Sequence, residues 1–462
     1  MAARFRNIDR NTPMFLPCDL RDWVPANHIV HFILEAVALL PVQTFKVNDR
    51  GTGDAQYPPA MMLALLIYCY ATGRSSSRQI EAATSSDVAV RYLCANTHPD
   101  HSSICEFRVA NRAAFEAAFV QVLQYAHELK LGQVGAVSVD GSKIQANASK
   151  HSAVSYQRAG EMIEQLQLEV RELLTRAEQA DAQDAATGLD IPAELARREQ
   201  RLAALQQARQ VIAARAKEQA QADQAEYAAK QARRQAQRDA GQKPRGAEPS
   251  APSAEPDPKA QYNFTDPESR IMKAGSGQHF EQAYNAQAAV DERMLIVGER
   301  VSQAPNDKAE LVPTVAAISP VVAPEVGAVL ADSGFYSASA VQAVEQNPDG
   351  TASGKTVYAA VERGHHHKTV ADLLPQPDPP PLAADATPQE QMAHRLKTAA
   401  GKELYKLRKQ TVEPVFGIIK EVMGFRRFHL RGRVKVSLEW TLVCVSYNLK
   451  RMFVLKNMIK AA

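Results

Sequence analysis

Two short apolar segments that lie far apart in the chain end in the same way. Residues 136–142 read AVSVDGS and residues 328–334 read AVLADSG, so Asp140 and Asp332 each follow an apolar run and precede a glycine within two residues. Apolar runs of this length that stop at a polar residue and a glycine predict strands that end at a turn. The two carboxylates converge if these strands are neighbours in one sheet, and this condition restricts the fold more than any other feature.

The long segment between the two strands has a different composition. From about residue 158 to 240 it is rich in Ala, Gln, Glu and Arg, and a break at residues 187–195 divides it. Apolar residues recur at heptad-like spacing before and after the break, at Ile163, Leu166, Val170, Leu173, Ala177 and Ala180, and at Leu195, Leu202, Leu205, Ile212 and Ala216. This spacing predicts an antiparallel helical hairpin, followed at 241–260 by a disordered linker rich in Pro, Gly, Ser and Ala.

The other segments predict an all-α domain followed by an α/β domain. Strands are expected at 137–140, twice within 279–304, at 326–332 and at 356–362, and helices at 306–318, 337–346 and 401–424. The resulting order, βββαβαβα, is that of an α/β ribonuclease H-like domain, in which helices cover a mixed sheet. We expect four parts: an all-α N-terminal domain at 1–132, the α/β domain at 133–155 and 261–435, the hairpin and linker at 156–260, and a C-terminal helix at 436–462 that packs on the α/β domain.

Positive charge gathers near the C-terminus. From Lys402 to Lys460 there are 14 Lys and Arg against 4 Asp and Glu, although the net charge of the whole chain is only +3. Such a segment indicates a polyanion partner, usually DNA or RNA, or else a solvated basic surface. Short paired helices within 75–131 permit a helix-turn-helix that reads DNA, although such pairs are frequent in all-α domains of any function.

Cysteine usage and hydropathy exclude some classes of protein. The 5 cysteines are scattered and include no CxxC pair, so neither a disulfide framework nor a zinc site is expected. Residues 1–13 lack the apolar stretch of a secretory signal, and the apolar run at 60–71 is too short to cross a bilayer. A protein of the reducing cytoplasm without membrane contact fits these observations.

A third carboxylate completes a possible set. Glu413 lies among apolar residues in TVEPVFGIIK, where an acid either pairs with a cation or binds one. Three carboxylates suit Mg²⁺ or Mn²⁺, which prefer oxygen ligands, and two such ions can clamp a phosphodiester. The alternatives are that Glu413 pairs with Arg408 or Lys409 and that each aspartate is a cap between strand and turn.

Several ordered motifs resemble those of a bacterial insertion-sequence transposase of the DDE type, in a branch that resembles the IS-four and IS-five superfamilies and carries a helical insertion after the first Asp. VDGSKIQANAS at 139–149 is similar to the first-aspartate motif, LADSGFYS at 330–337 to the second, and YKLRKQTVEPVFGIIK at 405–420 to the glutamate motif. Segments at 57–83, 99–108, 265–273, 283–291 and 306–308 (NDK) also resemble this branch.

The resemblance implies a metal-dependent enzyme and names its residues. Asp140, Asp332 and Glu413 would be the catalytic residues and would bind two Mg²⁺ or Mn²⁺ ions in the catalytic α/β domain. The site would cut the ends of the element and join the freed 3′-OH to target DNA.

The resemblance also implies contacts with DNA phosphates. Tyr405, Arg408 and Lys420 would make them, but the gap from Arg408 to Glu413 is one residue longer than in the family, so Lys409 is an alternative to Arg408. Three further DNA-binding candidates are Lys143, Asn285 and Gln287, and the alternative for the two amides is that they only complete hydrogen bonds within a hairpin.

The implied partners are double-stranded DNA, as terminal inverted repeats and as target, and a second copy of the chain in a homodimer on DNA. The protein would then act near the nucleoid. The N-terminal domain would bind DNA or dimerise. The hairpin would dimerise, clamp DNA or only pack on itself, and the histidines at 365–367 are interpreted as a solvated loop or a contact with the DNA backbone.

Two other functions stay open. One is a ribonuclease H-like nuclease that cuts without strand transfer, and the other is an inactive DNA-binding or coiled-coil interaction protein.

Overall fold

The computed structural model describes residues 19–47, 55–183, 190–241, 243–244, 247–274, 279–362, 377–383 and 385–461. Contacts between residues divide the chain into two compact units. The first unit joins residues 1–144 to residues 285–462, and the second comprises residues 145–284.

Helices make up the N-terminal part of the first unit. They are α1 (Ile29–Ala38), α2 (Pro59–Ala71), α3 (Ser77–Ser86), α4 (Val88–Leu93), α5 (His101–Ala110) and α6 (Arg112–Glu128), with short 3₁₀ helices at Leu20–Trp23 and Val42–Thr44. The carboxylates of Asp87 and Asp100 accept bonds from the first-turn amides of α4 and α5, as N-cap residues do. Within the segment 75–131, where short paired helices are expected, Asn111 separates α5 from α6.

A mixed sheet forms the centre of the α/β part. Its strands are β1 (Ala136–Gln145), β5 (His279–Val290), β6 (Ile296–Ser302), β7 (Ala328–Ala331) and β8 (Thr356–Ala359), and the hydrogen-bonded order runs β6-β5-β1-β7-β8. β1 is parallel to β7 and β7 to β8, whereas β5 and β6 are antiparallel. β4 (Arg270–Ala274) pairs with residues 279–283 of β5, within the second unit. A mixed sheet with a helical N-terminal part agrees with the predicted fold class.

Several elements differ from their predicted bounds. β1 continues past Asp140 to Gln145, so this aspartate does not end its strand, because β1 also pairs with β5. α9 (Leu311–Ala316) is shorter than the helix expected at 306–318. α10 (Ala338–Glu345) and α12 (Pro388–Lys397) precede α13 (Ala399–Gly417), which passes into a π-helix at Ile418–Val422.

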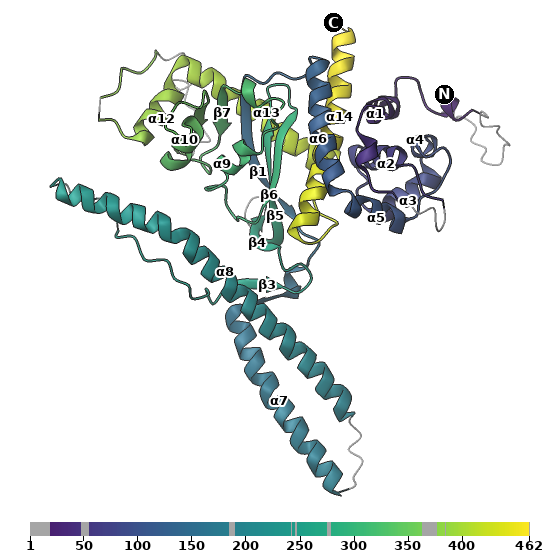
Figure 1. Ribbon diagram of the computed structural model, residues 1–462, viewed down its shortest axis with the longest axis vertical. Helices are drawn as coiled ribbons and strands as arrows, with labels where there is room; N and C mark the ends of the chain where they lie inside the picture. The colour runs from purple at the N-terminus through teal and green to yellow at the C-terminus, as the bar shows by residue number, and fades with distance from the viewer. Residues whose placement is uncertain are drawn as a thin grey trace, which may run out of the picture. The chain divides into compact units, whose positions relative to one another are not determined.

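The last helix, α14 (Arg433–Ala461), connects the sheet to the N-terminal helices. It packs against β6, α2 and α6, and Figure 1 shows it running alongside α6. Trp440 Nε1 donates to the carbonyl of Gln287 at 3.1 Å, and the Asn448 amide exchanges bonds of 2.8 Å with the backbone of Ile296. The middle of α14, residues 438–449, is buried on every side, whereas both ends are partly exposed. None of the helices in the described ranges is long and apolar enough to span a membrane.

The second unit contains a helical hairpin. α7 (Tyr156–Gln183) and α8 (Ile191–Asp239) pack on each other (Figure 1), and short strands β2 (Ala153–Ser155) and β3 (Gln261–Asn263) pair at their base. The apolar core of the hairpin consists of Val154, Ala159, Ile163, Leu166, Leu205 and Ala208. The described part of the predicted linker contacts α8, where Arg234 donates to the carbonyl of Ala247 at 3.2 Å.

Candidate active site

Strand register places the two aspartates on one face of the sheet. Ala136 pairs with Ala328 and Ser138 with Leu330, each in a parallel ladder. Because side chains alternate across a strand, residues two positions further along share the face of Ser138 and Leu330. Those residues are Asp140 and Asp332.

Helix α13 covers the same face and brings the third acid. Leu404 and Leu407 pack against the cluster formed by Ala136, Ala328 and Leu330. One turn later, Thr411 Oγ1 donates to Ser138 Oγ at 2.8 Å. These contacts fix the position of α13 over β1 and β7, and therefore place Glu413 beside the two aspartates.

A single guanidinium joins the three carboxylates. Arg408 Nη1 lies 2.5 Å from Glu413 Oε1, and Arg408 Nη2 lies 3.7 Å from Asp140 Oδ2 and 3.8 Å from Asp332 Oδ2. The alternative predicted from sequence, that Glu413 pairs with Arg408, is thus found, but the same arginine also faces both aspartates. Lys409 is exposed.

The three acids differ in their access to solvent. The exposed fraction of the side chain is 18% for Asp140, 38% for Asp332 and 48% for Glu413. Burial raises the pKa of Asp140 to about 7, the Arg408 charge opposes that rise, and Asp332 adds to it. A buried carboxylate near a second one needs a cation beside it to stay ionised at neutral pH.

The donor atoms suit a hard divalent cation, because all three side chains offer carboxylate oxygens. Within the described ranges, however, no three His, Cys, Asp or Glu side chains are arranged to hold a metal ion directly. The Arg408 guanidinium lies where such an ion would contact all three acids. A metal ion that contacted all three acids would displace the Arg408 guanidinium.

The residues expected to contact phosphates lie around this site. Tyr405 Oη donates to the carbonyl of Ala331 at 3.1 Å, immediately before Asp332. Lys420 Nζ donates to the carbonyl of Lys143 at 3.4 Å, and burial lowers the pKa of Lys420. Contact of these side chains with DNA stays a prediction, and the histidines at 365–367 lie outside the described residues.

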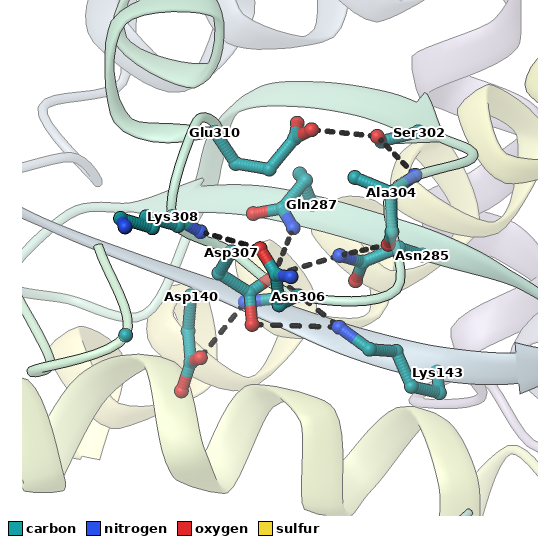
Figure 2. A network of polar contacts seen from close by, with 12 residues as sticks. Asp140, Lys143, Asn285, Gln287, Ser302, Ala304, Asn306, Asp307, Lys308 and Glu310 are labelled. Carbon is teal, nitrogen blue, oxygen red and sulfur yellow. Dashed lines mark hydrogen bonds and ion pairs between the residues drawn. The ribbon is translucent and has the colours of Figure 1, made fainter. Parts of the chain in front are cut away.

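Asn285 and Gln287 are fully buried. Both belong to β5 and both amides donate to Asp307, as does the ammonium of Lys143 (Figure 2). Asp307 carries no predicted role, although it is the central residue of the NDK segment in the family resemblance. Its partners come from two distant strands, β1 and β5, and no local pattern in the sequence predicts these contacts.

Two family models match parts of the chain. One, described as a transposase DDE domain, matches residues 383–453, and the other, described as a transposase domain (DUF772), matches residues 18–110. The first match covers Glu413 and Arg408 but neither Asp140 nor Asp332. The second covers helices α1 to α5. No curated protein and no solved structure matches the chain.

Proposed function

The two matches support an insertion-sequence DDE transposase, and from this premise we propose that the chain cuts the DNA ends of its element and joins the 3′-OH to target DNA by two-metal-ion phosphoryl transfer. The observation that carries the proposal is the convergence of Asp140, Asp332 and Glu413 on one guanidinium. Separate turn caps or a simple ion pair would not bring three acids from β1, β7 and α13 to one cation.

Each acid has a distinct part in the proposal. Asp140 belongs to strand β1 and supplies a buried metal ligand, whereas the more exposed side chains of Asp332 and Glu413 supply ligands from the solvent side of the site. Two Mg²⁺ or Mn²⁺ ions, when bound, would activate the attacking oxygen and stabilise the leaving oxygen. The family implies in general that the reaction depends on a divalent cation. The choice of ion and the count of two belong to the proposal.

In the proposal, cationic side chains bind the phosphates of the DNA. In the proposal Arg408 leaves the acids when the metal binds and turns its fork of donors to a phosphate, the geometry to which a guanidinium is suited. Tyr405 and Lys420 line the same region of the site and hold the DNA strand beside Asp140, whereas the Lys143 ammonium is paired with Asp307.

The finer architecture is part of the same proposal. The elements of the α/β part run β1, β4, β5, β6, α9, β7, α10, β8, α12 and α13, and they follow the order βββαβαβα apart from the additional β4 and α12. This order supports a ribonuclease H-like catalytic domain at 133–155 and 261–435. We place DNA binding or dimerisation in residues 1–132, the insertion at 156–260, and homodimer formation on the element ends.

Single substitutions of the acids test the reaction. Asp140→Asn, Asp332→Asn and Glu413→Gln should each lower Mg²⁺-dependent cleavage of a plasmid carrying the element ends by at least about a hundredfold, because a metal ligand supports several kcal/mol of transition-state stabilisation. Glu421→Gln, an exposed acid on the following π-helix, is the matched control and should cut like the parent.

Joining separates this function from a simple nuclease. A labelled element end with a free 3′-OH should become covalently linked to a target plasmid in the presence of Mg²⁺. Cleavage without joining would favour the nuclease alternative, and acid variants that cut as well as the parent would refute the proposed site.

A further inference from the structure

The turn between β6 and α9 is held by its own hydrogen bonds. Ser302 Oγ donates to Glu310 Oε1 at 2.7 Å and accepts from the amide of Ala304 at 3.0 Å. Arg300 forms an ion pair with the same buried glutamate, and the Glu310 amide donates to the carbonyl of Asp307 at 3.0 Å. Asp307 therefore lies on a fixed turn (Figure 2).

The carboxylate of Asp307 collects three donors from the sheet. Asn285 Nδ2 and Gln287 Nε2 each donate to its Oδ1 at 2.7 Å, and Lys143 Nζ lies 3.3 Å from Oδ1 and 3.4 Å from Oδ2. Asn285 and Gln287 are two positions apart on β5, so their side chains point to the same face. Asn285 Nδ2 also donates to the carbonyl of Ala304 at 3.3 Å, whereas Asn285 Oδ1 and Gln287 Oε1 accept no hydrogen bond from the described residues. The Asp307 carboxylate is therefore the side-chain acceptor that both amides share.

This cluster lies directly against the backbone next to Asp140. A Cβ added to Gly141 would fall 2.2 Å from Gln287 Nε2, 2.5 Å from Asp307 Oδ1 and 2.9 Å from Asn285 Oδ1. Real Cβ atoms do not approach other atoms so closely, so only glycine fits while the cluster is in place. The Gly141 amide in turn donates to Asp140 Oδ1 at 2.8 Å.

We propose that Asp307 is a positioning residue for Asp140. It holds the Asn285 and Gln287 amides against Gly141, and Gly141 orients the Asp140 carboxylate. Its charge also neutralises Lys143, the cation three residues beyond Asp140. The inference rests on the proposed function, because it concerns the geometry of a ligand in that site.

The variant Asp307→Asn keeps the shape of the side chain and removes its charge. The Mg²⁺-induced rise in melting temperature should shrink because Asp140 is misplaced, and cleavage of the element-end plasmid should fall at least about tenfold, since small misplacements of reacting groups are costly. Affinity for a plain DNA duplex should stay within about twofold of the parent. The slope of log affinity against log salt concentration should become steeper by up to about 0.9, because the freed Lys143 can neutralise one more phosphate.

A second substitution separates the two effects. Adding Lys143→Met to Asp307→Asn should return the salt dependence to that of the parent and leave the Mg²⁺ response weak. Gly141→Ala should weaken the Mg²⁺ response by itself, without a change in salt dependence, because its Cβ displaces the cluster. Asp349→Asn, an exposed turn aspartate, is the matched control and should behave like the parent in every assay.

The outcomes distinguish this inference from the proposed function. A parent that does not cleave would count against the proposed function, yet the Mg²⁺ response and the salt dependence could still be read. An Asp307→Asn protein with the parent's Mg²⁺ response and cleavage would overturn the inference. So would parallel loss of melting temperature, DNA affinity and cleavage, which would indicate a structural role only.

Discussion

In the proposed site, Arg408 and a divalent cation would compete for the same three carboxylates. The guanidinium lies within 3.8 Å of an oxygen of each acid and itself is almost fully buried. Coulomb attraction keeps it there, because three carboxylates this close would otherwise repel one another. Any ion that binds the acids must therefore first displace an internal cation.

This competition predicts the effect of removing the guanidinium. In Arg408→Gln the acids are no longer paired, so Mg²⁺ meets no competitor and stabilises the fold more than it stabilises the parent. The Mg²⁺-induced rise in melting temperature, measured by differential scanning fluorimetry, should exceed that of the parent by about 2 °C or more. Cleavage of the element-end plasmid should fall, because the phosphate loses its arginine.

Lys409→Gln is the matched control on the same helix. Lys409 is exposed and has the family spacing to Glu413, so it also tests the alternative left by the sequence. Its Mg²⁺ response should equal that of the parent. An Arg408→Gln protein with an unchanged or smaller Mg²⁺ response would show that the arginine does not occupy the position of the ion.

Among the elements, the sequence predicts those that repeat a pattern. Apolar alternation and the two Asp-containing ends locate β1 and β7, and the register Ser138 to Leu330 brings Asp140 and Asp332 together as expected. The extension of β1 past Asp140 is missed, because a glycine after an aspartate is typical of a turn and pairing with β5 overrides that preference.

The contacts that escape prediction join distant segments. Arg408 is predicted as a phosphate contact or as the partner of Glu413, but its place beside all three acids follows from how α13 packs on the sheet, which sequence spacing alone does not specify. Asp307 lies in a turn without any periodic pattern, and its role is visible only from its distances to Gln287 and Lys143.

Where α14 packs against α2, the buried carboxylate of Glu439 lies beside His429. Glu439 accepts bonds from Tyr70 Oη at 3.0 Å and from the backbone amide of His429 at 2.9 Å, and His429 Nε2 lies 2.8 Å from Ser75 Oγ. Burial lowers the pKa of His429 below its ordinary 6.5, although the Glu439 charge opposes that effect. The folded chain therefore favours the neutral imidazole.

A pH dependence of stability follows from this shift. The unfolded chain binds the proton more readily, so the stability that His429 contributes is complete above about pH 6.5 and is lost as the pH falls through the lower folded pKa. His429→Gln cannot take up the proton. The gap in melting temperature between parent and variant should therefore narrow or reverse as a thermal scan series moves from pH 8 to about pH 5.

His151→Gln, at an exposed histidine, serves as the control and should follow the pH profile of the parent. If His429→Gln runs parallel to the parent over the whole range, protonation at this junction does not limit the stability of the fold.

At the scale of the whole molecule, the hairpin is closed at its base. The amides of Tyr156 and Gln157 donate to the carbonyls of Ala260 at 2.9 Å and Pro258 at 3.1 Å, and β2 pairs with β3 next to them. The two ends of the insertion are thus adjacent in space. Its apolar core comes mostly from α7 and α8 themselves, so the insertion is expected to fold as a separate unit.

This closure predicts that the hairpin can be removed. Replacing residues 158–257 by a short Gly–Ser linker should leave the melting transition of the first unit and its Mg²⁺ response unchanged, because a short loop can bridge adjacent ends at small entropic cost. Leu205→Ala in the full chain is the companion variant, since it should weaken the hairpin core by about 2 to 5 kcal/mol without altering the Mg²⁺ response.

The variant in which a linker replaces residues 158–257 also tests what the hairpin does. Light scattering on DNA-bound protein would show whether the proposed homodimer forms without the hairpin, and salt-dependent binding would show whether DNA contacts disappear. If both persist, the hairpin packs only on itself, as its own core permits. If instead the first unit melts at a lower temperature or loses its Mg²⁺ response, the insertion supports the three-carboxylate site directly, and the division of the chain into independent units is wrong.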